Sequence, residues 1–220
     1  RNKIPILVGG TMMYFNSLVK PLNEMPESTP EARKNVEKDL DMHGLDEMYK
    51  KLSKIDPIIV KKIKGTDKQR IMRALEVYYI TGKPLSFYHK PKMKPDTNYK
   101  LLKIALIPSN RTLLNSRIEI RVNDMLKKGF IEEVESLMKN NPSLDLTYPA
   151  LRSVGYKQVY EHIMGTISFD DLIEKIVIAT RQLAKRQMTW IRGMDNLLMI
   201  DPFDKNFDIT ITNSVRKFLE

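Results

Sequence analysis

The residues best suited to chemistry gather first in a short N-terminal stretch. The run IPILV at residues 4–8 is apolar and of strand length, and Gly9-Gly10-Thr11 leads from it into a helix-like segment at Met12. In α/β proteins a strand, a glycine-rich turn and a helix bring backbone N–H groups up to a phosphate. Neither G-x-x-x-x-G-K-S/T nor G-x-G-x-x-G occurs at this stretch. The stretch therefore indicates one half of a phosphate-binding signature.

A second candidate is a basic helix face near the C-terminus. The chain carries 37 Lys+Arg against 27 Asp+Glu, a formal net charge of +10, which favours an anionic partner such as nucleic acid. The cationic side of the helix predicted over residues 173–192 is made of Arg181, Lys185 and Arg192, with Gln182, Arg186 and Thr189 beside them. A face of one sign with amide and hydroxyl groups suits a phosphate backbone, and a solvated charged face is the alternative. Trp190 at its border could stack on a base or pack against the protein.

Two further clusters combine cations with polar or aromatic neighbours. Arg70 and Arg73 lie one turn apart at a predicted helix N-terminus, where the helix dipole disfavours cations. An anionic partner is one interpretation of that pair, and a solvated turn is the other. In ALRSVGYKQVY (150–160), Gly155 interrupts a helix-like pattern and permits a close backbone approach. The groups around it that could meet one nucleotide belong to Arg152, Tyr156, Lys157 and Gln158.

The helix predicted after Asn110 carries Arg117 and Arg121 four residues apart. Two guanidinium groups at this spacing could bind a diphosphate bidentately. Pairing of either arginine with Glu119, or with acids elsewhere in the chain, is an equally open interpretation.

Other kinds of chemistry find no support in the sequence. The absence of cysteine excludes disulfides and thiolate metal sites and fits a reducing cytosol. No apolar run approaches the roughly 18 residues of a membrane span. The three histidines have no zinc spacing, and no Ser-His-Asp order is legible. Asp170-Asp171 follows Ser168 and is interpreted as a capped helix start rather than a metal site.

Helix-start and helix-stop residues divide the chain into elements. They predict helices from Thr29-Pro30 to near Gly44, from Asp56-Pro57 to Gly65 and from Asp67 to Gly82, then a linker at 89–98. Strands are predicted at 4–8, 100–108 and 197–200, and further helices at 111–129, up to about 140, at 156–163, at 169–194 and at the C-terminus. The predicted fold class is α/β, mostly helical, with too few strands for a complete sheet.

Four separated segments resemble one family. VGGTMMY (8–14), DKQRIMRALEVYYITGKPL (67–85), LRSVGYKQVY (151–160) and ATRQLAKRQMTWIRG (179–193) are similar, in sequence and in order, to the bacterial tRNA dimethylallyltransferases, also called tRNA isopentenyltransferases. The resemblance covers essentially all 220 residues. It implies an incomplete P-loop-kinase-like core at residues 1–22 and 98–220, and an all-α insertion subdomain at 23–97 that contacts tRNA.

The resemblance also implies an activity. Members of this family transfer a dimethylallyl group from dimethylallyl diphosphate to N6 of the adenosine 3′ of the tRNA anticodon. For this chain it implies a monomeric, cytoplasmic transferase whose partners are the anticodon stem-loop and dimethylallyl diphosphate, with no membrane partner. Mg²⁺ and nucleotide (ATP) binding are implied as well, with no metal ligand expected within these 220 residues.

Matched motif to motif, the resemblance assigns roles to individual residues. Thr11 is the expected catalytic residue, with its hydroxyl near the diphosphate and the target base, and Arg121 is the second expected diphosphate ligand. The expected tRNA contacts are Arg33, Gln69, Arg70, Ile71, Met72, Arg73, Arg152, Ser153, Val154, Gly155, Tyr156, Lys157, Lys185, Arg186, Gln187, Met188, Thr189, Trp190, Ile191 and Arg192, together with Arg181.

One departure from the family is large. Its members carry a phosphate-binding loop and a general-base aspartate that have no match in this sequence. We therefore expect a C-terminal portion of the enzyme that is inactive alone. A non-catalytic module that grips the anticodon stem-loop is the alternative. A fragment of a P-loop small-molecule kinase would explain the opening stretch but not the basic helices.

Overall fold

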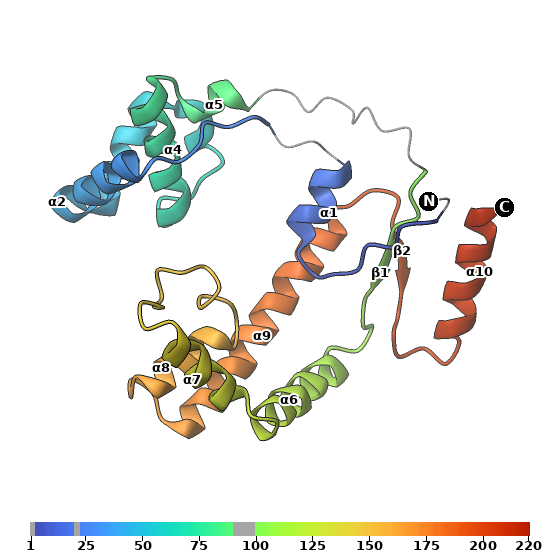
Figure 1. Ribbon diagram of the computed structural model, residues 1–220. Helices are drawn as coiled ribbons and strands as arrows, with labels where there is room; N and C mark the ends of the chain where they lie inside the picture. The colour runs from blue at the N-terminus through green and yellow to red at the C-terminus, as the bar shows by residue number, and fades with distance from the viewer. Residues whose placement is uncertain (1–2, 20–22, 90–99) are drawn as a thin grey trace. The chain divides into compact units, whose positions relative to one another are not determined.

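The chain folds into two compact units, seen in a computed structural model that describes residues 3–19, 23–89 and 100–220 (Figure 1). One unit is made of residues 1–12 and 98–220, and we call it the sheet-bearing unit; the other is made of residues 13–97, and we call it the helical unit. Helix α1 (Met12–Val19) begins where the two units divide. The functional division implied by the resemblance, with a tRNA-contacting insertion at 23–97, stays a prediction.

The helical unit is built from α2 (Pro30–Ile55), α3 (Pro57–Val60), α4 (Lys68–Thr81) and α5 (Leu85–Tyr88). Side-chain oxygens of Thr29, Asp56 and Asp67 accept backbone N–H groups at the starts of α2, α3 and α4. These three caps satisfy donors that a helix start leaves without an intrahelical partner. The predicted starts of the three helices are confirmed, as is the end of α4 at Gly82, whose φ is +68°.

One predicted helix end in this unit is confirmed as a break inside a longer element, and another is wrong. Gly44 has a non-helical backbone, with φ +75° and ψ 167°, so the first segment of α2 does break there, but a second segment continues to Ile55. That segment forms because Met48 and Leu52 lie one turn apart and bury in the core beside α4. The helix predicted up to Gly65 is shorter than expected, because α3 ends at Val60 and gives way to turns.

The interior of the helical unit is closed around apolar side chains and one buried acid. Leu52, Ile71 and Leu75 are fully buried. Asp56 is 1% exposed, and its second carboxylate oxygen accepts the backbone N–H of Ser86 at 2.7 Å. A buried carboxylate is costly unless both oxygens are hydrogen-bonded, so Asp56 ties the start of α3 to α5.

The sheet-bearing unit combines a small sheet with longer helices. Strands β1 (Ile104–Leu106) and β2 (Leu198–Ile200) pair in parallel, with Ala105 opposite Met199. The helices are α6 (Arg111–Lys127), α7 (Phe130–Asn140), α8 (Tyr156–Ile163), α9 (Phe169–Arg192) and α10 (Phe207–Leu219). α9 packs against α6 and α8, and their apolar faces surround a core that includes Val134, Val159 and Leu172.

The strand predicted at residues 4–8 is not formed. This segment belongs to the sheet-bearing unit but forms no strand with the described residues. Its side chains are open to solvent, with Ile6 and Val8 83% and 91% exposed. A strand needs a neighbour to pair its N–H and C=O groups, and the apolar pattern alone does not supply one. The strands predicted at 100–108 and 197–200 are confirmed in place and shorter, as β1 and β2.

The described residues thus form a mostly helical α/β fold with a two-stranded parallel sheet, as the sequence predicts at that level. The predicted linker at 89–98 lies, apart from His89, outside the described residues. No helix within the described ranges is long and apolar enough to cross a lipid bilayer.

Candidate functional site

The glycine turn before α1 is held against α9. The side-chain amide of Gln187 donates a hydrogen bond of 2.8 Å to the carbonyl oxygen of Gly10. A Cβ on Gly10 would lie 2.4 Å from that amide nitrogen, so the contact needs a residue without a side chain. Thr11 follows in an exposed position directly before α1. Gln187, an expected tRNA contact, therefore also holds the turn that carries the expected catalytic residue.

The basic face of α9 keeps three exposed cations, Lys185, Arg186 and Arg192, and none of them forms an ion pair with another described residue. Arg181 behaves differently, because its guanidinium pairs with the carboxylate of Glu119 on α6. The sequence places no acid on this stretch of α9, yet the fold supplies one from another helix. Cations without an ion pair on an exposed helix face suit binding of phosphate groups. Of the four cations predicted on this face, three have no ion pair with the described residues, and Arg181 has one.

The same ion pair decides between the interpretations of Arg117 and Arg121 on α6. Glu119 pairs with Arg181, and among the described residues it forms no ion pair with Arg117 or Arg121, so the predicted pairing with these neighbours is wrong. Arg117 instead lies over the ring of Phe203, 5.2 Å from its centroid, a cation–π contact. Arg121 is exposed and has no ion pair among the described residues, so it keeps a guanidinium available for an anion.

The glycine predicted to permit an unusual backbone at residue 155 does so. Gly155 has φ +96°, and a Cβ there would lie 3.1 Å from the ring of Phe130. Its N–H donates to the side chain of Gln158 at 2.8 Å. The hydroxyl of Tyr156 donates to Glu133, and this hydrogen bond raises the pKa of Tyr156. Gln158 and Tyr156 therefore serve the local structure.

The remaining groups of this segment face solvent. Arg152 and Lys157 are both exposed, and Lys157 forms a long ion pair of 3.6 Å with Glu161 on the next turn. Ser153 donates its hydroxyl to the carbonyl of Ala150 at 2.6 Å. Of the expected contacts here, the two cations are the ones best placed to reach a ligand from solvent.

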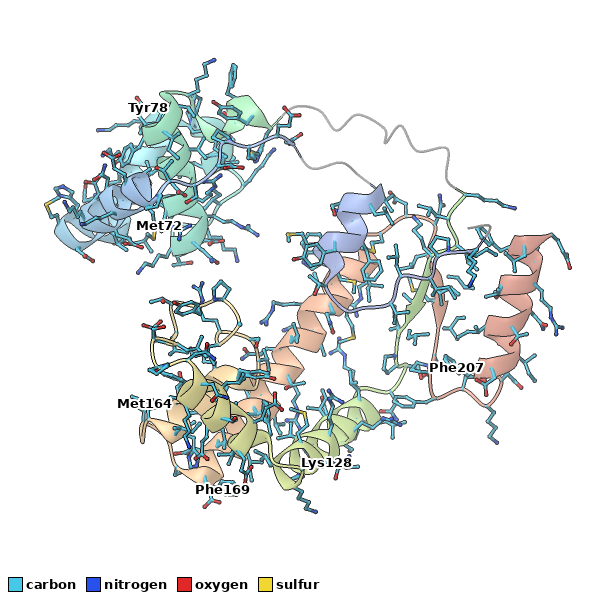
Figure 2. All side chains as sticks on the ribbon, in the orientation of Figure 1. Met72, Tyr78, Lys128, Met164, Phe169 and Phe207 are labelled. Atoms are coloured by element: carbon cyan, nitrogen blue, oxygen red, sulfur yellow. The ribbon has the colours of Figure 1, made fainter. Side chains whose placement is uncertain are left out.

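At the start of α4 the expected contact residues split into exposed and buried ones. Gln69 and Arg70 are exposed, and Arg70 lies 3.4 Å from the carboxylate of Asp67 that caps the helix. Met72, labelled in Figure 2, is half-buried on the same helix. Ile71 is completely buried in the core of the helical unit, and Ile191 on α9 is buried as well. The side chains of these two isoleucines therefore serve packing, and contact with RNA falls to their neighbours.

Arg73 and Arg33 are joined by a hydrogen-bonded chain that the sequence analysis missed. Arg73 donates to the carboxylate of Glu76 at 3.0 Å, Ser28 donates its hydroxyl to the same carboxylate, and Arg33 donates to Ser28 at 2.9 Å. The spacing of Arg73 and Glu76 is a sequence signal for an ion pair on a helix. No local pattern marks Ser28, which lies 48 residues from Glu76.

The acidic and histidine side chains of the described residues form no cluster of metal-ligand type. No group of three or more His, Asp or Glu side chains among them could hold a metal ion. The hydroxyl of Ser168 accepts the N–H of Asp171 at 3.1 Å, which confirms the interpretation of this acidic pair as part of a helix cap.

Comparison with known proteins identifies the family. The profile of the IPP transferases matches residues 1–194. The chain belongs to the IPP transferase family. The "tRNA dimethylallyltransferase" of Legionella pneumophila (strain Paris) is 44% identical over 221 residues, which span 100% of this chain and 70% of that protein. The enzyme of the same name from Neisseria meningitidis serogroup C (strain 053442) is 45% identical over 211 residues, 96% of this chain and 67% of that protein.

A solved dimethylallyltransferase structure has a similar fold. The crystallographic structure of a eukaryotic dimethylallyltransferase acting on tRNA matches with a TM-score of 0.63 and 27% identity, covering 98% of this chain and 57% of that one. The resemblance seen in the four sequence segments is thereby confirmed at the level of the family. The chain spans little more than half of the eukaryotic protein's length.

Proposed function

We propose that this chain acts in tRNA prenylation, as part of a transferase that moves a dimethylallyl group from dimethylallyl diphosphate to N6 of the adenosine 3′ of the anticodon. The observation that carries the proposal is the identity of 44% over the whole chain to a protein named tRNA dimethylallyltransferase. The exposed cations of α9 support an RNA substrate, because phosphate contacts supply most of the affinity of such interfaces.

The reaction sets the tasks that residues must perform. N6 attacks C1 of the allylic diphosphate, so a C–N bond forms as the C1–O bond breaks. The bonding electrons leave with the diphosphate, and the N6 proton passes to a base. We assign to Thr11 a hydrogen bond to the diphosphate and to Arg121 the uptake of its negative charge, which are tasks of donors aimed at developing charge.

The proposal assigns no step to Mg²⁺, because the described carboxylates and histidines form no cluster suited to it. Mg²⁺ and ATP binding stay expectations from the family resemblance. So do the monomeric state and the cytoplasmic location.

A P-loop-kinase-like core is the finer fold assignment that we propose. Its support is the apolar surface around the two strands: Leu106 and Met199 are 50% and 56% exposed, although parallel strands are normally covered on both faces. Further strands and helices over this sheet would bury that surface.

The deciding experiment measures transfer of a labelled dimethylallyl group to an anticodon stem-loop RNA. Two proteins are compared: the 220-residue chain, and the chain joined to the residues of the Legionella pneumophila relative that have no counterpart in it. We expect transfer by the joined protein only, because the chain holds no P-loop motif. Transfer by the chain alone would contradict that part of the proposal. Stem-loop binding without transfer by either protein would favour the non-catalytic module instead.

Two variants of the joined protein test the assigned residues. Thr11→Ala should lower kcat by about 100-fold, the scale for loss of one donor to developing charge, while Thr166→Ala, another exposed threonine, should not. Replacing Lys185, Arg186 and Arg192 by alanine should weaken stem-loop binding and reduce its salt slope by about 2 to 3. An unchanged salt slope would show that these cations of α9 do not contact the RNA phosphates.

A further inference from the structure

Glu76 is a buried carboxylate in the helical unit, and it accepts hydrogen bonds from two side chains of different segments. The residue is 6% exposed, and each of its oxygens has a different partner. Oε2 accepts a guanidinium N–H of Arg73 at 3.0 Å, and Oε1 accepts the hydroxyl of Ser28. Because a buried charge is costly unless it is fully paired, both partners are held firmly in place.

The hydroxyl of Ser28 links the carboxylate of Glu76 to a second arginine by hydrogen bonds. Its single proton is given to Glu76, which leaves its lone pairs to accept the guanidinium of Arg33 at 2.9 Å. Arg73 also donates to the carbonyl oxygen of Pro26 at 2.5 Å. One carboxylate therefore fixes the positions of two guanidinium groups, that of Arg73 on α4 directly and that of Arg33 on α2 through the hydroxyl of Ser28.

The two arginines keep capacity for an anion. Arg33 is exposed and the side chain of Arg73 is 35% exposed. A guanidinium has five N–H donors, and the hydrogen bonds described above engage one of them in Arg33 and two in Arg73. Within the hydrogen-bonded cluster two cations share one acid, which leaves a net charge of +1. Glu27 and Glu31 flank the cluster in exposed positions and form no ion pair with either arginine within the described ranges. One phosphodiester would neutralise the cluster.

We propose that Glu76 and Ser28 are positioning residues that hold Arg73 and Arg33 ready, as a preformed pair, for a phosphate of the RNA substrate. The inference rests on the proposed function, because it needs an RNA ligand. Its physical basis is preorganisation: a long side chain that is already ordered loses less freedom when the ligand binds. Arginine suits this role because its planar fork keeps donors free after one of them is engaged.

Glu76→Gln gives a test in which two explanations predict opposite signs. If Glu76 acts only through its charge, its neutralisation should strengthen RNA binding, because one negative charge is removed near the phosphates. If it positions the arginines, binding should weaken by about two- to tenfold, since two side chains must then be ordered by the ligand. The matched control is Glu47→Gln, which neutralises an exposed acid paired with Lys50 at 2.7 Å in the same unit and should not weaken binding.

The measurement is the affinity of the 220-residue chain, and of the joined protein described above, for a fluorescent anticodon stem-loop across a salt series. Melting temperatures are recorded for every variant. A double-mutant cycle of Ser28→Ala and Arg33→Ala extends it. Because Ser28 acts through Arg33, we expect the double variant to bind no more weakly than Arg33→Ala alone. Ser28→Ala removes one hydroxyl from an exposed residue, so it keeps the test valid if Glu76→Gln fails to fold.

The outcomes separate the two proposals. Binding by the unchanged chain, together with Glu76→Gln that binds as tightly as Glu47→Gln, would overturn the positioning role alone. Additive effects of Ser28→Ala and Arg33→Ala would overturn it too. A serine with a merely structural role would weaken RNA binding equally whether residue 33 is arginine or alanine. No binding of the stem-loop by either unchanged protein, the chain or the joined protein, would overturn the proposed function, and the inference with it.

Discussion

The helical unit and the two-stranded sheet differ in how much of their apolar surface they bury. In the helical unit Leu52, Ile71 and Leu75 are inaccessible to solvent, and capped helices enclose them. In the sheet, Leu106 and Met199 are half exposed. The helices of the sheet-bearing unit have a closed core of their own, so the difference belongs to the strands. Helices satisfy their backbone groups within one segment, whereas strands depend on neighbours for both hydrogen bonds and cover.

The largest expected effect comes from truncating one leucine in each region. Leu75→Ala should lower the free energy of unfolding of the helical unit by about 2–5 kcal/mol, because it leaves a cavity in a closed core. Leu106→Ala should cost about 1 kcal/mol or less, because half of that side chain is already in water. Urea unfolding followed by circular dichroism measures both. Equal losses would mean that the sheet is covered in solution.

A smaller effect comes from two glycines with positive φ, one in each unit. Alanine at Gly44 or Gly155 should be strained, by about 1–3 kcal/mol, because both backbones lie in regions that favour glycine. Gly155→Ala should cost about 1 kcal/mol more, since its methyl group would meet Phe130 at 3.1 Å while the space at Gly44 is open. Thermal unfolding of both variants tests this order, and the reverse order would contradict the packing of α8 on Phe130.

Gly10→Ala should have a modest effect on stability and a local effect on the turn. The methyl group would meet the end of the flexible Gln187 side chain, so that side chain moves and one hydrogen bond of about 1 kcal/mol is lost. The amide resonance of Thr11 should shift in Gly10→Ala, in Gln187→Ala and, by no larger amount, in the double variant. Independent shifts that add up would show that Gln187 does not hold the turn.

The smallest effect is a dependence of stability on pH in the helical unit. The hydroxyl of Tyr79 holds the pKa of Asp39 below its ordinary value, while burial, and then the bond to Asp39, raises the pKa of Tyr79. The Asp39 contribution is present above about pH 4 and is lost as pH falls through its lowered folded pKa, because the unfolded state then binds the proton more readily. The Tyr79 contribution is present below about pH 10 and is lost as pH rises through its raised folded pKa.

Tyr79→Phe should therefore weaken the pH dependence of the melting temperature of the helical unit, both near about pH 3 and near about pH 11. In the sheet-bearing unit, Tyr156→Phe is the matched change, because a hydrogen bond to Glu133 raises the pKa of Tyr156. We expect it to flatten only the alkaline end. An unchanged acid limb in Tyr79→Phe would mean that Asp39 is held by Lys51 alone, which lies 3.0 Å away.

Helix starts were predictable because their signals are local. Asp67 and Asn110 both cap helices with their side chains, as the sequence indicates, since a cap involves atoms only two or three residues away. The strand predicted at 4–8 failed because its apolar pattern says nothing of a partner. The family was recognisable from four short segments, and the profile match to residues 1–194 confirms it.

The candidate site was only partly predictable. The exposed cations Lys185, Arg186 and Arg192 lie on one helix, so their common face follows from helical periodicity. The pairing of Arg181 with Glu119 spans 62 residues, and the hold of Gln187 on Gly10 spans 177. No spacing within a single helix could have indicated either contact.

By itself, the sequence determined the net charge, the helix boundaries at the caps, the basic face of α9 and the family. Each of these depends on composition or on neighbours within a turn of helix. Only the tertiary structure decided which cations are free, which acid orders Arg73 and Arg33, and which side chain holds the glycine turn before Thr11. The physical reason is that hydrogen bonds and ion pairs act over about 3 Å in space, and distant segments reach that range only after the helices have packed.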